Sequence, residues 1–270
     1  MRIDNEIRKC VAFVGLQMAD ETYRYVGTVF WIGNDKIPRQ PIYLVTARHV
    51  IDGIRSLGLD KVHLRVNLTN GTSTWYPTNL RDWFSHPVDD SIDVAVHPDL
   101  LPPGLDHQVF PMSECVTPEL LAEKEVGVGD EVFIVGLFRH HKGEAKNIPI
   151  VRMGNLATLG EERIEVPKFG KIDAHLIEAR SIGGLSGSPV FLNFAPLKYP
   201  SGMVMPGHAR KHYLYGLVHG HFDSPSADID ALDVDDNSVN AEKVNTGIAM
   251  VIPFHSIERV ITEFEAARRT

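Results

Sequence analysis

The sequence predicts an all-β fold, with two packed six-stranded antiparallel barrels followed by a C-terminal α-helix. Short runs of β-branched and aromatic residues, broken by turn residues, recur along most of the chain in two successive sets. Little helical pattern separates the sets, and residues 253–264 have apolar side chains at helical spacing. We therefore expect an N-terminal barrel over residues 1–105 and a C-terminal barrel plus helix over residues 106–270, together one module.

The composition is that of an ordinary globular protein. Its 270 residues are enough to bury a sizeable core. The formal net charge of -8 argues against nucleic acid or an anionic membrane as a partner, because either needs a basic face. No apolar run approaches membrane-spanning length, and the charged N-terminus does not resemble a signal peptide. With only Cys10 and Cys115 as cysteines, we expect a cytoplasmic protein, and the oligomeric state stays open.

The first set of expected strands precedes a Leu-Pro-Pro-Gly linker at residues 101–104. Asn70-Gly71 is a strong hairpin signal, and residues 48–54 have helical spacing. The expected strands of this set are 10–16, 22–32, 41–47, 62–66, 73–76, 83–87 and 92–96.

The second set begins after a short helical turn that starts near Thr117, with Pro118 at its first position. Its expected strands are 131–138, 151–159, 163–166, 175–179, 188–192, 213–219 and 246–252.

Residues 183–189 read Gly-Gly-Leu-Ser-Gly-Ser-Pro, ahead of a strand. Glycines allow a sharp backbone bend and a close approach of substrate, so Ser186 is a candidate nucleophile. The same composition is also typical of an ordinary hairpin loop. The loop alone does not decide between the two.

Two further residues stand at the ends of apolar strands. His49 follows Tyr-Leu-Val-Thr-Ala-Arg, where a strand passes into a helical turn; a structural histidine is the alternative. Asp93 directly adjoins Val-Ala-Val, so we expect it to be partly buried and therefore paired. Asp89, Asp90 and Asp99 are nearby competitors that lack this adjacency.

His49, Asp93 and Ser186 occur in that order, the first two in one β half and the third in the other. This arrangement resembles the chymotrypsin-like (trypsin-fold) serine proteases over most of the chain. The motifs that carry the resemblance are the histidine box at 45–50, the aspartate strand at 93–96 and the nucleophile loop at 184–189.

Residues 128–136 and 247–253 are similar to strands of the bacterial Deg/HtrA-like branch. Because only residues 253–270 follow the last expected strand, we expect no C-terminal PDZ domain.

The resemblance implies a serine endopeptidase that cuts a polypeptide substrate without a cofactor. Ser186 would attack the carbonyl, His49 would act as general base, and Asp93 would orient the imidazole. The backbone N–H groups of Gly184 and Ser186 would form the oxyanion hole. Leu185 stands where digestive members have an aspartate, which removes activation by a newly cut N-terminus.

The resemblance also suggests substrate-binding residues. Arg180, with Ser181 beside it, falls at the floor of the specificity pocket, and His219 and His221 fall on the strand that lines it. Arg180 would favour an acidic substrate side chain, unless it points to solvent or pairs with Glu178. Many family members have a serine at the place of His219, which hydrogen-bonds the catalytic aspartate; a histidine there would donate to Asp93 or perturb the site.

We expect no metal site. The acidic insert at 223–242 contains alternating carboxylates at 228–237, but it lacks the central glycine of an EF-hand, which favours an acidic loop over a calcium site. The histidine pairs at 140–141 and 219–221 come without cysteines at zinc spacing.

Two rival functions remain. The first is a catalytically silent trypsin-fold protein that acts as a binding or regulatory module. The second is an esterase of the α/β-hydrolase type, which the absence of glycine two residues after Ser186 and the low helical content disfavour.

Overall fold

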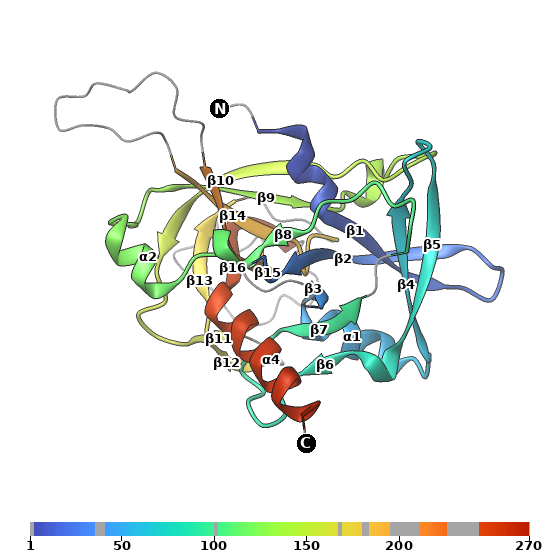
Figure 1. Ribbon diagram of the computed structural model, residues 1–270. Helices are drawn as coiled ribbons and strands as arrows, with labels where there is room; N and C mark the ends of the chain where they lie inside the picture. Colours follow the sequence, from blue (N-terminus) through green and yellow to red (C-terminus); the bar gives the residue numbers. More distant parts are fainter. Residues whose placement is uncertain are drawn as a thin grey trace.

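The structure is a computed structural model that describes residues 3–35, 41–99, 102–166, 169–179, 184–194, 211–225 and 243–269. These residues form an eight-stranded sheet and a closed six-stranded barrel, with a helix at the C-terminal end (Figure 1). The predicted fold class, mostly β with a C-terminal helix, is therefore confirmed. Among the described residues, no helix is long and apolar enough to cross a membrane.

The first sheet contains the strands of the N-terminal half, in the order β5-β4-β1-β2-β3-β7-β6, with β8 paired to β2. Its strands are β1 (Val11–Gln17), β2 (Tyr23–Gly33), β3 (Ile42–Thr46), β4 (Lys61–Asn67), β5 (Ser73–Asn79), β6 (Phe84–Ser85), β7 (Ala95–Asp99) and β8 (Phe110–Pro111).

This sheet differs from the six-stranded antiparallel barrel that the sequence predicts. Within the described residues, β5 and β6 stand at opposite ends of the strand order, and β8 pairs with β2 in parallel. The chain between β5 and β6 forms a 3₁₀ turn, η2 (Leu80–Asp82), and β6 has only two residues. So short a strand offers too few backbone groups to close the barrel.

The closed barrel has the order β10-β13-β16-β15-β14-β9. Its strands are β9 (Glu131–Gly136), β10 (Ile150–Thr158), β13 (His175–Glu178), β14 (Pro189–Phe194), β15 (Lys211–Pro225) and β16 (Lys243–Pro253).

One predicted barrel strand, residues 163–166, belongs elsewhere. It forms β11 (Ile164–Val166), which pairs with β12 (Gly170–Ile172) in a separate hairpin. The sequence does not predict β12, because its three residues include an exposed Gly and Lys and show no strand pattern.

Short helices connect these strands. The expected turn near Thr117 is α2, whose first turn is capped by the Thr117 hydroxyl, an acceptor for the Leu120 amide at 3.3 Å. The helices are η1 (Asn5–Cys10), α1 (Arg48–Ser56), η3 (Met112–Glu114), α2 (Pro118–Glu123), η4 (Arg139–His141) and α4 (Phe254–Ala267).

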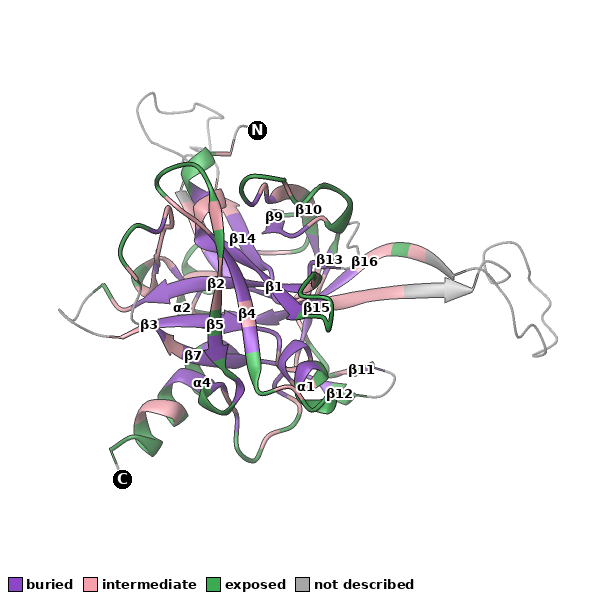
Figure 2. Cartoon of the chain, turned by 90° about the vertical axis from the view of Figure 1, so that its right-hand side faces the viewer, coloured by how far each residue is buried: buried purple, intermediate pink, exposed green. Residues whose placement is uncertain are grey.

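An apolar core joins the two sheets. Phe191 on β14 lies between Phe110 on β8 and Phe133 on β9, with both ring centroids 5.1 Å away. The helix α4 follows the last barrel strand but lies beside β6 and β7 of the first sheet (Figure 1). Buried residues cluster on the strands that cross the middle of the molecule (Figure 2). A closely packed core of this kind fixes the positions of the two sheets relative to each other.

Candidate active site

The strand β3 and the helix α1 position His49. The chain leaves β3 at Thr46 and enters α1 at Arg48, and Ala47, the residue at the N-cap, provides no side-chain acceptor. The first amides of a helix lack partners within it, and the backbone N–H of His49 donates instead to Asp93 Oδ1 at 2.8 Å. The carboxylate of Asp93 therefore both caps α1 and contacts the side chain that α1 presents.

Asp93 lies two residues before β7 and is only 5% exposed. Its Oδ2 is 2.7 Å from Nδ1 of His49 and 2.5 Å from Nδ1 of His219 on β15. An ionised carboxylate only accepts hydrogen bonds, so both imidazoles carry a proton on Nδ1. This tautomer leaves Nε2 of neutral His49 with a free lone pair, as a general base requires.

The charges of the site stabilise one another. Burial by itself would raise the pKa of Asp93, but the charge of His49 and the hydrogen bonds from His219 and His49 hold that pKa well below its usual range. Burial likewise disfavours the charged form of His49, yet the adjacent Asp93 raises the pKa of His49 above its ordinary value of 6.5. The attraction between the Asp93 carboxylate and the His49 imidazole is therefore strongest when Asp93 is ionised.

Ser186 lies in the turn that leads into β14, between two residues with positive φ: Gly184 at 107° and Gly187 at 80°. Its hydroxyl donates to the backbone carbonyl oxygen of His219, 3.2 Å away. Within the described residues no hydrogen bond joins Ser186 Oγ to His49, although the ring centroids of His49 and His219 are only 5.0 Å apart. Such hydrogen bonds are often long without substrate and tighten in the complex.

Thr28 on β2 stabilises the turn that contains Ser186. It is fully buried, and its backbone N–H donates to the carbonyl oxygen of Ser186 at 3.0 Å. Its Oγ1 donates to the carbonyl oxygen of Gly184 and accepts from the Leu137 amide, both at 3.0 Å. A first-sheet side chain thus fixes a turn of the barrel that is more than 150 residues away in sequence.

Gly187 permits this close approach. A Cβ at this position would lie 2.2 Å from Oγ1 of Thr46 and 2.3 Å from the carbonyl oxygen of Thr28. Only glycine fits here, so Gly187 permits the backbone bend that the sequence predicts and also allows the two sheets to meet.

The β11–β12 hairpin reaches the imidazoles. The Phe169 ring lies edge-on to His49, with centroids 5.7 Å apart, and to His219, with centroids 5.0 Å apart. It remains 48% exposed. A pocket of about 290 Å³ opens beside it, lined by Arg48, His49, Asp52, Asp90, Asp93, Phe169 and Ile172.

The distances around Asp93 are those of hydrogen bonds. His49, Asp93 and His219 are the described residues that come together as a possible ligand set. Ligands of a tetrahedral zinc lie about 3.3 Å from one another, given zinc-ligand distances near 2.0 Å. The separations of Asp93 Oδ2 from Nδ1 of His49, 2.7 Å, and from Nδ1 of His219, 2.5 Å, are shorter than that. In this arrangement the atoms are therefore joined by hydrogen bonds.

The remaining predicted residues divide into two groups. His221 lies on β15 opposite Ala249, two residues beyond His219. Arg180 and Ser181 lie outside the described residues, as does the acidic stretch at 228–237.

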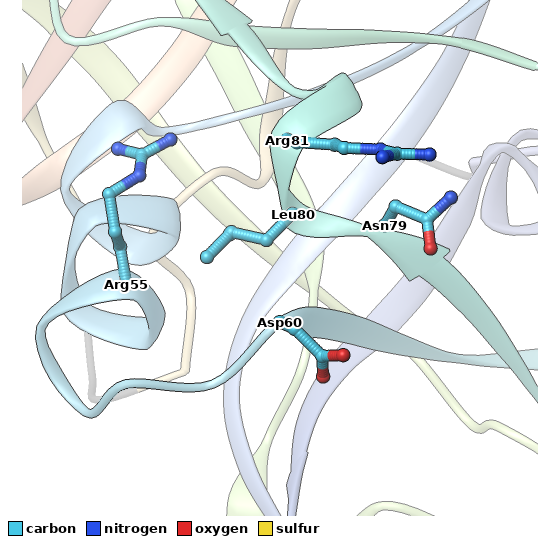
Figure 3. A pocket seen from close by; sticks show the side chains of 5 residues that line it. All are labelled: Arg55, Asp60, Asn79, Leu80 and Arg81. Carbon is cyan, nitrogen blue, oxygen red and sulfur yellow. The ribbon is translucent and has the colours of Figure 1, made fainter.

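A different pocket lies at the far end of α1 (Figure 3). It measures about 490 Å³ and is lined by five residues, among which Leu80 lies between Arg55 of α1 and Asn79 in this view. Arg55 lies seven positions after Arg48 on α1, a rise of about 10 Å along the helix. This pocket therefore contributes nothing to the site around His49.

Sequence reasoning missed Thr28 and Phe169. Thr28 is one of many β-branched residues in an expected strand, and nothing in its neighbours marks it. Phe169 falls between two expected strands, in a stretch without a pattern. The one signal in the sequence for a role of Phe169 is that it is an isolated aromatic residue between two expected strands.

No protein-family model matches the sequence, and no curated protein matches it either. Solved structures do resemble it. Deg5 aligns over 94% of this chain and 88% of its own, with 15% identity and a TM-score of 0.48. An inactive serine-to-alanine variant of Rv3671c from M. tuberculosis aligns over 96% and 88%, with 16% identity and a TM-score of 0.48.

The active form of the Rv3671c protease aligns over 94% of this chain and 80% of its own, with 17% identity and a TM-score of 0.47. At TM-scores below 0.5 the likenesses say nothing about the chemistry of the site.

Replacing Thr28 tests how the turn is held. Thr28→Val removes the hydroxyl that serves Gly184 and Leu137 but keeps the volume. We expect a loss of about 1–3 kcal/mol in the free energy of unfolding, measured in urea, because two buried partners lose their hydrogen bond. Thr28→Ser is the matched control, since it keeps the hydroxyl and loses only a methyl group. Equal stability of Thr28→Val and the parent would contradict this account.

Replacing Asp93 tests the electrostatics. In Asp93→Asn the imidazole of His49 loses its countercharge while burial persists, so its pKa should fall below 6.5, as measured by NMR titration of the ring.

The pH dependence of stability follows from the same two shifts. The raised pKa of His49 contributes stability below pH 6.5 that is lost as the pH rises through the folded-state pKa. The lowered pKa of Asp93 contributes stability above pH 3.8 that is lost as the pH falls toward its folded-state pKa.

An unchanged His49 titration in Asp93→Asn would show that the carboxylate does not control the imidazole.

Proposed function

We propose that the protein is a serine endopeptidase that hydrolyses peptide bonds through an acyl-enzyme formed on Ser186. The observation that carries the proposal is the 2.7 Å contact between Nδ1 of His49 and the buried carboxylate of Asp93. It orients the imidazole with Nε2 unprotonated, next to a turn that presents a serine hydroxyl.

In the proposed reaction, Ser186 Oγ attacks the carbonyl carbon while His49 Nε2 takes its proton. The tetrahedral intermediate then breaks its C–N bond, and His49 returns the proton to the departing amine. A water molecule, deprotonated by His49, attacks the acyl-enzyme and releases the new carboxyl group and Ser186. Asp93 stays ionised throughout and stabilises the imidazolium that forms twice in the cycle.

Backbone groups near Ser186 support an oxyanion hole. Among the described residues, the N–H groups of Gly184 and Ser186 donate to no acceptor. Unpaired amides that flank a nucleophile are the donors that stabilise a developing oxyanion. We propose these two for that role, with Thr28 fixing the carbonyl groups of the same two residues.

His219 is the proposed positioning residue. Its Nδ1 shares Oδ2 of Asp93 with His49, and its carbonyl oxygen accepts the Ser186 hydroxyl. It thereby connects the acid, which belongs to the first sheet, with the nucleophile turn of the barrel.

One contact favours a second function, that of a catalytically silent binding module. The Ser186 hydroxyl is committed to the His219 carbonyl, and Phe169 lies against both imidazoles. If substrate does not release these contacts, the site binds peptides without cutting them. Covalent labelling separates the two functions.

A fluorophosphonate probe tests the nucleophile. We expect the parent protein to be labelled and Ser186→Ala not to be, with a loss of roughly 10⁴- to 10⁶-fold in peptide hydrolysis. Ser188→Ala is the matched control and should label normally, because Ser188 Oγ is buried and has no hydrogen-bond partner in the described structure. Labelling that persists in Ser186→Ala, or is absent from the parent, would reject the proposal.

Two substitutions of His219 test its role. His219→Leu removes the donor to Asp93, and we expect kcat to fall about 10- to 100-fold with little change in KM, the equivalent of one hydrogen bond to a charged group. The acid limb of the pH profile should move to higher pH, since Asp93 then acts on His49 alone. His219→Asn, which offers an N–H donor near the position of Nδ1, should restore most of the rate. Equal rates for His219→Leu and the parent would remove His219 from the account.

A further inference from the structure

A larger pocket lies beside the nucleophile turn, between the first sheet and the connection from β9 to β10. Its volume is about 780 Å³, and it is lined on one side by Tyr25 and Trp75 and on the other by a basic stretch, residues 139–142. These four residues read Arg-His-His-Lys. The function proposed above makes no use of them.

The aromatic side is built rigidly. The ring of Trp75 stacks on Tyr23, with centroids 3.8 Å apart and planes 13° apart, and it is tilted by 49° against Tyr25, with centroids 5.4 Å apart. Trp75 also covers Gly15, where a Cβ would lie 2.5 Å from the indole. Stacked rings of this kind provide a flat apolar surface at little entropic cost.

The basic side is also held in place. Arg65, a buried residue of β4, donates to the carbonyl oxygens of Gly143 at 2.8 Å and Glu144 at 2.5 Å. Ser73 on β5 donates to the carbonyl oxygen of Ala145 at 2.8 Å. The connection is therefore anchored to the first sheet, and its side chains extend from a fixed backbone.

The cations at this pocket lack acidic partners. In the described part of the chain, neither Arg139 nor Lys142 forms an ion pair with a carboxylate, and the ammonium of Lys142 lies 4.6 Å from the centre of the Tyr25 ring. Two effects lower the pKa of Arg139: burial, which is the larger, and the like charge of the neighbouring Arg24. The lining contains one carboxylate, Glu144, against the cations Arg65, Arg139 and Lys142. In a chain of net charge -8, this local excess of positive charge favours an anionic ligand.

The pocket adjoins the nucleophile turn. A Cβ at Gly184 would lie 3.2 Å from Cγ of Arg139, and the guanidinium of Arg139 donates to the carbonyl oxygen of Val26 at 3.4 Å. Val26 is two residues from Thr28, which holds the turn. A polypeptide bound at Ser186 would therefore pass directly beside Arg139.

We propose that this pocket is a substrate subsite for an acidic residue, Asp or Glu, located a few positions from the bond that is cut. The carboxylate would pair with Arg139 and Lys142, and neighbouring apolar groups of the substrate would pack on Tyr25 and Trp75. This inference rests on the proposed endopeptidase function, under which the bound polypeptide is a substrate. A polypeptide rather than a nucleic acid is favoured because the pocket adjoins the serine turn and the net charge repels polyanions.

Binding to the full-length Ser186→Ala variant tests the subsite without turnover. The probes are short alanine-serine peptides in matched pairs, each with one Glu or, at the same position, one Gln, scanned along the peptide. Trp75 reports binding by fluorescence, since the other two tryptophans, Trp31 and Trp83, are buried in the core. At one position we expect the Glu peptide to bind about tenfold more tightly than its Gln twin.

Added substitutions locate the effect. Arg139→Gln with Lys142→Gln should abolish the preference for Glu, and salt should weaken it in the parent. Arg81→Gln is the matched control, an exposed arginine at the pocket of Figure 3, and should leave the preference unchanged.

Three results would overturn the subsite: equal affinity of every Glu and Gln pair, a Glu preference that survives the double substitution, or tighter binding of a single-stranded oligonucleotide than of any Glu peptide. Fluorophosphonate labelling of the parent reports on the hydrolase alone. Selective binding without labelling would reject the endopeptidase and retain an acidic-peptide site, and labelling without selective binding would reject the subsite alone.

Discussion

The carboxylate of Asp93 is the constraint on which the rest of the site depends. A buried charge is stable only with donors, and this one has three: the backbone N–H and Nδ1 of His49, and Nδ1 of His219. Two of them come from α1, the helix that follows β3 of the first sheet, and the third comes from β15 of the barrel. The ion therefore fixes the start of a helix, the tautomers of two imidazoles and the relation between the two sheets at once.

The same dependence on both sheets extends to the serine. Thr28 on β2 holds the carbonyl groups of Gly184 and Ser186, and Gly187 fits only because it has no side chain. The proposed base, His49, and the proposed nucleophile, Ser186, thus lie on opposite sides of the junction between the two sheets, which is built from these close contacts and from the apolar core. A shift of either sheet would separate them, which explains why the packed core between the sheets matters for the proposed chemistry as well as for stability.

Sequence patterns predicted the mostly-β class, the terminal helix and the position of His49 at the junction of β3 and α1, because apolar runs and turn residues are local signals. They placed the start of the strand beside Asp93 too early, since β7 begins at Ala95. They could not predict that Asp93 caps α1 or that Thr28 holds a distant turn, because those partners are defined only by the fold. The aromatic contact of Phe169 was also invisible, since a three-residue strand carries too short a pattern to recognise.

The central claim is that Ser186 forms a covalent acyl intermediate. Rapid acid quenching of the protein with an excess of a peptide ester, followed by intact and peptide-level mass spectrometry, tests it most directly. The account predicts a mass increase equal to the acyl part of the substrate, located on Ser186 and transient in time. Turnover of the substrate with no adduct on Ser186, or an adduct on another residue, would contradict it.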